Sequence, residues 1–432
     1  MTGPQSPDSL QVLRYGLLGL PLAAAALPLY LLTPQLYAGQ LGLPLAWVGI
    51  ALMASRLIDA VADPILGQWI DRTSGPRFQR WVIPALVLLC MGLTALFIPP
   101  RTQLAPAGLL AWMAGAAVLV SLANSAAGLA HQAWPVAWGL GPTDQARLVS
   151  ARELFTLVGV ILASVAAALE APWVILSMVI LAAALAGWSI QGLAGQNLPQ
   201  DQGQGQHPRL RLIQGLVALD PRGRASFLCL SLNALANAIP ATLFLFFVTD
   251  ALAMSRGAAA GLLGLYFLSA LMGIPLWNRQ IQSGMSPGRA WVWALAGSIL
   301  LFLAVPWLGP DAAWVFAVIC VGTGLCLGAE LIAPALLISQ ALERKGLAQA
   351  RNGEFFGLWN LFAKLALALA AGASLPLLDL AGYSPGASPA PFALGLVYAG
   401  FPCLLKLTAL FLFLTLERPH DSPADRSQTP PA

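Results

Sequence analysis

Charged residues are scarce in this sequence. Asp, Glu, Lys and Arg make up 9% of its 432 residues, whereas a soluble domain usually has about 25%. Hydrophobic residues make up 58%, and the mean hydropathy is +0.75. This composition excludes a water-soluble enzyme and a disordered scaffold. The net charge of +4 is too small to indicate a nucleic-acid partner.

Histidine and cysteine are also rare. The chain has three histidines, and its five cysteines lie within apolar segments without a metal-binding spacing. No apolar segment has a Ser–His arrangement suited to nucleophilic catalysis. We therefore expect no disulfide, no zinc site, no enzymatic activity and no cofactor. Residues 1–16 have neither a basic segment nor a small-residue cleavage site, so the first apolar segment is predicted to be a retained membrane span.

Long apolar segments are what the sequence has instead. Each is about as long as the roughly 20 residues that a helix needs to cross a bilayer. None alternates polar and apolar residues as a barrel strand does, so the predicted fold class is an all-α integral membrane protein. Twelve spans are predicted, at residues 12–36, 44–70, 81–99, 107–138, 148–169, 172–193, 226–250, 258–278, 290–308, 312–338, 352–378 and 391–416.

A polar segment rich in Gln, Gly and Pro divides the spans into two sets of six. The basic loop residues lie on the same side of the predicted bundle as this segment and the termini, with two exceptions. Arg101 and Arg256 lie in loops on the opposite side. Because basic loops stay in the cytoplasm, we expect a multi-pass protein of the inner (cytoplasmic) membrane with both termini cytoplasmic. Two such bundles are typical of a transporter. The predicted domains are a six-helix bundle at 1–194, a linker at 195–225, a second six-helix bundle at 226–418 and a tail at 419–432.

A few ionisable residues lie within the predicted spans. Each costs about 2.5–3.5 kcal/mol at the bilayer centre, so these residues must pair with one another or line a water-filled pathway. Structural ion pairs and a polar pathway through the bundle are the two interpretations. The residues are Arg56, Asp59, Asp63, Arg152, Glu153, Glu330, Lys364 and Lys406.

Asp59 and Asp63 are candidates for binding a coupling cation. Together with Arg56 they are spaced at i, i+3 and i+7, so all three project from one helix face. Two carboxylates one turn apart, with no counter-ion expected from another helix, suit Na⁺ or a shared proton. In the alternative interpretation, Arg56 neutralises one aspartate and the pair is structural.

The second predicted span ends in a recognisable motif. Gly67, Asp71, Arg72 and Gly75 form the pattern G-x-x-x-D-R-x-x-G. This pattern resembles the signature loop of the major facilitator superfamily, whose fold has twelve transmembrane helices in two six-helix bundles. It predicts a cytoplasmic gate, in which Gly67 permits close helix approach while Asp71 and Arg72 pair across the halves and cap helix ends.

Residues 56–73, RLIDAVADPILGQWIDRT, add a more specific resemblance. They are similar to the motif of the glycoside–pentoside–hexuronide:cation symporters, the melibiose permease family, and similar segments recur along nearly the whole chain. The resemblance implies that Asp59 and Asp63 bind the coupling cation. It also places Asn124 at the position of a further cation ligand.

The same resemblance implies a substrate site. Arg152 matches a sugar-binding arginine of the fifth helix, and Lys364 matches a lysine of the eleventh helix. Two of the family's sugar-binding acids are missing, one of them replaced by Ala127. His131 and Trp134 lie in the same span, where an aromatic ring can stack on a sugar or a cation. His131 can equally be a packing residue.

Glu330 has no basic neighbour in its own span. It can pair with Lys364 or Arg152, or bind the substrate, and the sequence does not choose among these. Arg152 is followed by Glu153, which lies about 100° round the helix and is therefore expected to be a poor partner. We expect Arg152 to contact the substrate. Lys406 is expected to form a structural pair or to extend toward the membrane interface.

These residues predict a secondary symporter that couples Na⁺ or H⁺ to a small polar solute by alternating access. The resemblance favours a sugar or glycoside, and the alternative within the family is a lysolipid or another amphiphile. A non-transporting receptor and a membrane-embedded enzyme are alternatives from another class, and the short outer loops and missing catalytic clusters argue against them. The expected partners are the solute, a monovalent cation and the lipid bilayer, with no nucleic acid. The expected oligomeric state is a monomer.

Overall fold

The computed structural model describes residues 6–73, 77–100, 104–168, 172–191, 193, 219–348, 350–380 and 392–417. Most of the predicted linker, residues 195–218, and the whole predicted tail at 419–432 lie outside these ranges. Within them the chain forms helices joined by short turns, with no β-strand. The predicted all-α class is confirmed.

The helices of the first half follow the predicted spans. Several begin at a proline, whose fixed φ suits the first helical position. A two-residue turn separates the first two helices, which together form the first span. The helices are α1 (Ser9–Gly16), α2 (Gly19–Pro34), α3 (Leu45–Arg72), α4 (Arg77–Phe97), α5 (Pro106–Ala137), α6 (Pro142–Ala168) and α7 (Pro172–Gln191).

The second half has the same plan. Side chains of Asp220, Ser255 and Ser286 accept hydrogen bonds from the first turns of three of its helices and so define where these begin. The first of them begins at Pro221, earlier than the predicted boundary at residue 226. The helices are α9 (Pro221–Phe246), α10 (Arg256–Gln282), α11 (Pro287–Phe302), α12 (Ala313–Arg344), α13 (Asn352–Leu380), α14 (Phe392–Gly395) and α15 (Phe401–Glu417).

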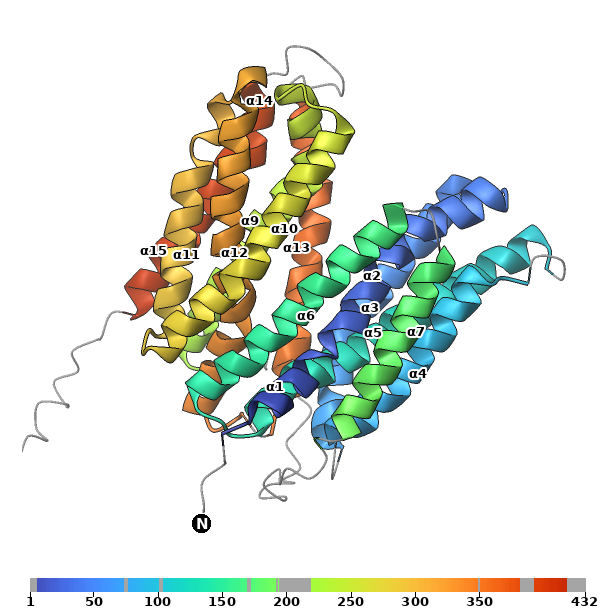
Figure 1. The fold of residues 1–432 in the computed structure, drawn as a ribbon, viewed down its shortest axis with the longest axis horizontal. Helices are drawn as coiled ribbons and strands as arrows, with labels where there is room; N and C mark the ends of the chain where they lie inside the picture. Colours follow the sequence, from blue (N-terminus) through green and yellow to red (C-terminus); the bar gives the residue numbers. More distant parts are fainter. Residues whose placement is uncertain are drawn as a thin grey trace, which may run out of the picture.

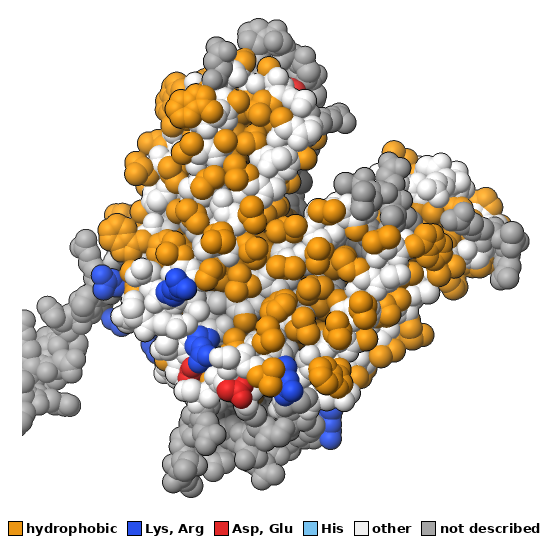
Figure 2. All heavy atoms as spheres, in the orientation of Figure 1, with side chains coloured by type: hydrophobic (Ala, Val, Ile, Leu, Met, Phe, Trp, Pro, Cys, Tyr) orange, Lys and Arg blue, Asp and Glu red, His pale blue; other side chains and the backbone are white. Residues whose placement is uncertain are grey.

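The helices have the length and surface of membrane spans. Among the described residues, eleven segments are long and apolar enough to cross a membrane, and α7 contains a shorter apolar segment, Leu176–Gln191. Hydrophobic side chains cover the outer surface of both halves (Figure 2). An exposed apolar surface of this extent is stable in lipid rather than in water.

The two halves meet at one end of the molecule and separate at the other (Figure 1). We call the end at which Asp71 of α3 contacts α13 the closed end, and the opposite end the open end. Near the closed end, α3 and α5 pack against α13, and α6 packs against α10 and α12. The helices that join the halves are therefore the second, fourth and fifth spans, in the first half, and the eighth, tenth and eleventh spans, in the second half.

The buried apolar residues form two clusters. The larger one includes residues of both halves, such as Trp134 and Phe355. The smaller one lies within the second half, where Phe247, Phe316 and Tyr398 are in ring contact. The halves are therefore joined by a shared apolar core as well as by polar contacts.

Both halves have the same local structure at the end of their first span. A turn of π-helix, η1 (Gln35–Gln40), follows α2, and another, η2 (Phe247–Ala251), follows α9. A left-handed residue follows each turn, namely Gly42 with a φ of 72° and Ala253 with a φ of 51°. The two halves thus share the local structure at this point, as expected for related halves.

Candidate functional site

Three charged side chains meet between the two halves. Asp59 and Asp63 lie one turn apart on α3, and Lys364 lies on α13. The Lys364 Nζ is 2.6 Å from Asp59 Oδ2 and 2.6 Å from Asp63 Oδ2. We call these three residues the ion trio. The trio links the first half to the second.

Ser125 of α5 also belongs to this site. Its hydroxyl donates to Asp59 Oδ1 at 2.5 Å and accepts from Lys364 Nζ at 3.0 Å. Asn124, the predicted ligand, is the preceding residue, and no protein atom among the described residues donates to its buried Oδ1. Sequence reasoning missed Ser125, although its position beside Asn124 was a signal for it.

The lysine of the trio corrects one expectation. Asp59 and Asp63 were expected to have no counter-ion from another helix, and this is wrong because Lys364 pairs with both. With all three groups ionised, the trio has a net charge of −1. The Lys364 side chain is 30% exposed, whereas that of Asp63 is fully buried. Lys364 is therefore the member of the trio that solvent or a solute can reach.

α3 and α13 come into backbone contact next to the trio. A Cβ added at Gly67 would overlap the carbonyl oxygen of Gly353, and one added at Gly353 would lie 2.6 Å from the Gly67 oxygen. Two facing glycines allow this approach, because neither helix has a side chain at the crossing point. The close approach expected at Gly67 is present, and its role in gating stays a prediction.

Asp71 makes the polar part of this contact. Its Oδ1 accepts a hydrogen bond from Gly353 N at 2.9 Å, and its Oδ2 accepts one from Glu354 N at 2.8 Å. A carboxylate at a helix N-terminus is stabilised by the free amides and by the helix dipole. Arg72 is exposed at the end of α3. The predicted contact across the halves is thus made by Asp71, and Arg72 lies at the surface.

Other hydrogen bonds join the halves at the closed end. Gln145 of α6 donates to Glu343 Oε1 of α12 at 2.7 Å and accepts from the Ser339 hydroxyl at 2.6 Å. Asn352, the first residue of α13, donates to the Ala133 carbonyl of α5 at 2.9 Å. No sequence motif indicated these pairs, because the partners lie on helices that are distant in the chain.

His131 and Trp134 are packed inside the first half. The His131 Nε2 is 2.9 Å from the Tyr15 carbonyl oxygen, and the Tyr15 hydroxyl donates to the His131 carbonyl at 2.7 Å. Trp134 stacks on Phe78, with ring centroids 5.7 Å apart. Both side chains are almost fully buried. In this conformation neither ring has a free face, so substrate contact by His131 or Trp134 stays a prediction that requires rearrangement.

Arg152 pairs with the residue next to it. Its Nη2 and Nε are 2.6 Å and 3.0 Å from Glu153 Oε1. The expectation that Glu153 is a poor partner is wrong. Both side chains are long enough to turn toward each other, and an isolated buried charge is unfavourable. The Arg152 Nη1 is buried and donates to no protein acceptor among the described residues, and its contact with a substrate stays a prediction.

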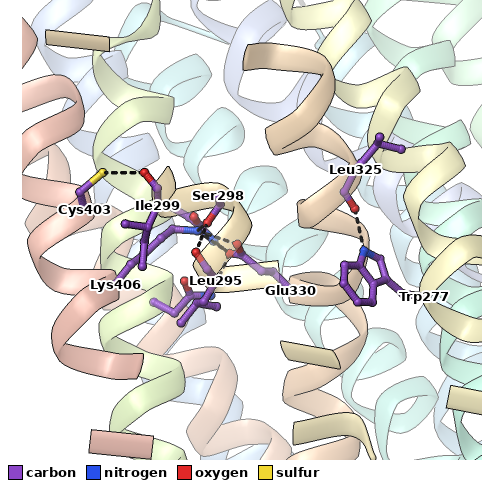
Figure 3. A network of polar contacts seen from close by, with 10 residues as sticks. Trp277, Leu295, Ser298, Ile299, Leu325, Glu330, Cys403 and Lys406 are labelled. Atoms are coloured by element: carbon purple, nitrogen blue, oxygen red, sulfur yellow. Dashed lines mark hydrogen bonds and ion pairs between the residues drawn. The ribbon is translucent and has the colours of Figure 1, made fainter. Parts of the chain in front are cut away.

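Glu330 pairs with Lys406 of α15. The Lys406 Nζ is 2.6 Å from Glu330 Oε1 and 2.8 Å from Oε2. Neither Lys364 nor Arg152, the partners considered from sequence, occupies this position, because each has its own carboxylate. The structural pair expected for Lys406 is present (Figure 3).

The comparisons with known proteins agree with this architecture. The sequence model of the family described as MFS/sugar transport protein matches residues 13–417. A bacterial homologue of the iron transporter ferroportin, in an outward-facing state, has a similar structure with a TM-score of 0.75 at 13% identity. That match covers 94% of this chain and 98% of the other. No curated protein sequence matches the chain.

A second solved structure gives the same result. A variant of the E. coli fucose:proton symporter matches with a TM-score of 0.69 at 12% identity, covering 95% of this chain and 98% of the other. At such identities the likeness concerns the fold alone. The predicted major facilitator fold, with two six-helix bundles, is confirmed.

Proposed function

This chain belongs to the MFS/sugar transport protein family, and we propose that it is a symporter that couples one monovalent cation, Na⁺ or H⁺, to a small polar solute. The chain is a membrane transporter and not an enzyme, since its family and its structural neighbours are transporters. Within the family, the motif at residues 56–73 favours the melibiose permease-like cation symporters.

The observation that carries this proposal is the charge of the ion trio. The two aspartates and the lysine together have a net charge of −1, and binding of one Na⁺ or one proton to these three residues neutralises it. Three other buried ion pairs, Arg152 with Glu153, Arg351 with Glu354, and Glu330 with Lys406, each contain one acid and one base. Among these four clusters of described residues, the trio is the one with a charge imbalance that a monovalent cation would correct.

The ligand atoms of the trio suit a hard cation. Asp59 and Asp63 provide carboxylate oxygens, and Ser125 provides a hydroxyl oxygen 2.5 Å from Asp59 Oδ1. Asn124 has a buried amide oxygen to which no described protein group donates. Oxygen ligands of this kind bind alkali cations, and a proton needs only one of the carboxylates. Asp59, Asp63 and Ser125 would hold the coupling ion, and Asn124 is the further ligand that the sequence resemblance implies.

Competition with Lys364 gives a route from cation binding to movement. The ammonium lies where it neutralises Asp59 and Asp63, so a cation that binds the two carboxylates weakens their attraction for the lysine. Because Lys364 belongs to the second half and the aspartates to the first, this releases one link between the halves. The freed ammonium is partly exposed and is then available to a polar group of the solute.

The distribution of basic residues supports an orientation in the membrane. On the face shown in Figure 2, the Lys and Arg side chains that the structure describes gather at the closed end. Since basic loops stay in the cytoplasm, the closed end and both termini would be cytoplasmic. The conformation is then outward-facing, and the contacts of Gly67 and Asp71 with α13 form its cytoplasmic gate.

Uptake into proteoliposomes tests the function. We expect a Na⁺ or proton gradient to drive accumulation of at least one sugar or glycoside from a defined panel. Asp59→Asn and Asp63→Asn should each abolish gradient-driven accumulation, because the trio loses its uncompensated charge. Asp144→Asn is the matched control, since Asp144 pairs with Arg147 in the first turn of α6. Accumulation at the wild-type rate in both trio variants would refute the coupling role.

A further inference from the structure

We propose that Asn233 and Asn237 of α9 form a subsite that accepts hydrogen bonds from hydroxyl groups of the transported solute. The Glu330–Lys406 pair holds the two amides in the required orientation. The subsite extends the proposed transport function, because it assigns the chemical class of the solute and places part of its binding site in the second half.

The anchor of this subsite is a buried ion pair. The side chains of Glu330 and Lys406 are 2% and 11% exposed. Lys406 Nζ contacts both carboxylate oxygens and also donates to the Ser298 hydroxyl at 3.1 Å. Figure 3 shows Lys406 and Glu330 extending toward each other from different helices, with Ser298 beside them. The two charges neutralise each other. Hydrogen bonds hold Lys406 through Ser298 and Glu330 through the two asparagines.

The anchor sets the orientation of the two amides. Asn233 Nδ2 donates to Glu330 Oε2 at 3.0 Å, and Asn237 Nδ2 donates to the same oxygen at 2.7 Å. An ionised carboxylate only accepts hydrogen bonds, so in each asparagine the NH₂ group must face Glu330. The amide oxygens are therefore directed away from the carboxylate. They present two hydrogen-bond acceptors.

The two acceptors lie on one face of α9, and no described protein group donates to the buried one. Asn233 and Asn237 are four residues apart, which places them one turn from each other. Asn233 is 4% exposed, and its Oδ1 is buried with no hydrogen-bond partner in the protein. Asn237 is partly exposed. A buried acceptor is stable only when a donor reaches it, so a donor-bearing molecule that enters past Asn237 would satisfy both groups.

The donor expected here is a hydroxyl group. Glu330 has both oxygens occupied and is neutralised by Lys406, so the cluster offers no net charge to a cation. Two neutral amide oxygens one helical turn apart suit a solute with several hydroxyl groups. α9 also packs against α13, the helix of Lys364. A polyhydroxylated solute that contacts both the asparagines of α9 and Lys364 of α13 would connect this subsite to the ion trio.

Thermal unfolding of the purified full-length protein tests the subsite. The probes are L-fucose, D-galactose and myo-inositol, with choline as the cationic comparison, each titrated in the presence and absence of Na⁺ and at two pH values. A molecule that binds the native state raises the Tm as its concentration rises. We expect at least one of the three polyols to raise the Tm of the wild-type protein, and choline to have no such effect.

Variants then locate the binding. Asn237→Leu and Asn233→Leu should each weaken the apparent affinity for that polyol about fivefold to tenfold, as for loss of one hydrogen bond. Thr242→Val is the matched control on α9, because the Thr242 hydroxyl donates to the Ala238 carbonyl of its own helix. A deoxy analogue lacks the hydroxyl group that donates to Asn237, so it should bind the wild-type protein more weakly than the parent polyol does. The Asn237→Leu variant should bind the deoxy analogue and the parent polyol equally well. A purely structural role would not produce this pattern.

The outcomes separate the subsite from the coupling mechanism. The subsite is overturned if no polyol shifts the wild-type Tm, if choline alone does, or if both asparagine variants bind the polyol with wild-type affinity. Polyol binding that is lost in the asparagine variants but insensitive to Na⁺, pH and Asp59→Asn would instead support the subsite and overturn cation coupling.

Discussion

The substitution Gly67→Ala tests how closely the two halves must approach to close the proposed gate. The added Cβ would lie 2.5 Å from the Gly353 carbonyl carbon and 2.9 Å from Glu354 N, whereas 3.4–4 Å is ordinary contact. The two helices must therefore separate by about 1 Å at this point. Asp71 accepts hydrogen bonds of 2.9 Å and 2.8 Å from α13 in the wild-type protein. Such a shift lengthens both beyond hydrogen-bond range.

The expected cost follows from those contacts. A hydrogen bond to a charged group contributes about 1.5–3 kcal/mol, and partial solvation at the helix end reduces the combined loss of the two Asp71 bonds to about 2 kcal/mol. The cost falls on conformations in which the closed end is shut. A difference of that size changes the ratio of shut to open molecules about 30-fold.

Distance measurements between spin labels provide the assay. Labels at Thr143 on α6 and Gln282 on α10 lie on opposite halves and are exposed. In Gly67→Ala we expect a longer-distance population to appear or grow. Gly49→Ala on the same helix is the control, because nothing lies within 4 Å of a Cβ there. If Gly67→Ala and Gly49→Ala give the same distribution as wild type, the closed end does not depend on this contact.

Three further outcomes follow from the structure. Asp71→Ala should open the closed end in the same distance measurement, whereas the exposed Arg72→Ala should change it little; equal effects would contradict the assignment of the contact to Asp71. Glu330→Gln and Lys406→Met should each destabilise the protein by about 3–5 kcal/mol, because each leaves its partner as an unpaired buried charge. The double variant should recover most of this loss. Additive losses of stability in thermal unfolding would show that the two charges do not interact. Ala253→Gly should raise the Tm, by an amount equivalent to about 1 kcal/mol, because it relieves a positive φ of 51°; a lower Tm would mean that the alanine is not strained.

The positions of the spans were predictable because lipid imposes a strong constraint. A backbone in lipid must satisfy its own hydrogen bonds, so twelve long apolar segments implied helices, and the polar segment after residue 194 implied two halves. The close approach at Gly67 was also predictable, because a glycine at the end of a span permits helix contact. These features depend on local sequence alone.

The ion-pair partners were harder to predict, since they depend on how each helix is rotated about its axis. Lys364 faces Asp59 and Asp63 from the other half, which composition and spacing do not reveal. Lys364 and Arg152 were the partners considered for Glu330 from the sequence, whereas the packing of α15 brings Lys406 to it. Requiring a basic partner for every buried carboxylate would have indicated that the aspartates also pair with a base from another helix.

Arg152 illustrates a different limit. Spacing on the helix surface predicted that Glu153 would point elsewhere, and that rule describes exposed positions in water. Inside the bundle, where few alternative partners exist, the two long side chains turn toward each other and pair at 2.6 Å. Spacing rules for helix surfaces are therefore a weak guide to buried charges.

The net charge of the ion trio has a consequence for the effect of membrane voltage on the proposed transport cycle. If one cation binds the trio as proposed, together with a neutral solute, the trio is neutral and the loaded protein would change conformation without moving net charge. The empty protein moves one negative charge, and a full crossing changes its energy by about 2.3 kcal/mol per 100 mV. Transient currents should therefore occur without solute and disappear in Asp63→Asn. An interior-negative potential would then act on the return of the empty transporter, and it would hold the unloaded protein ready on the outer side.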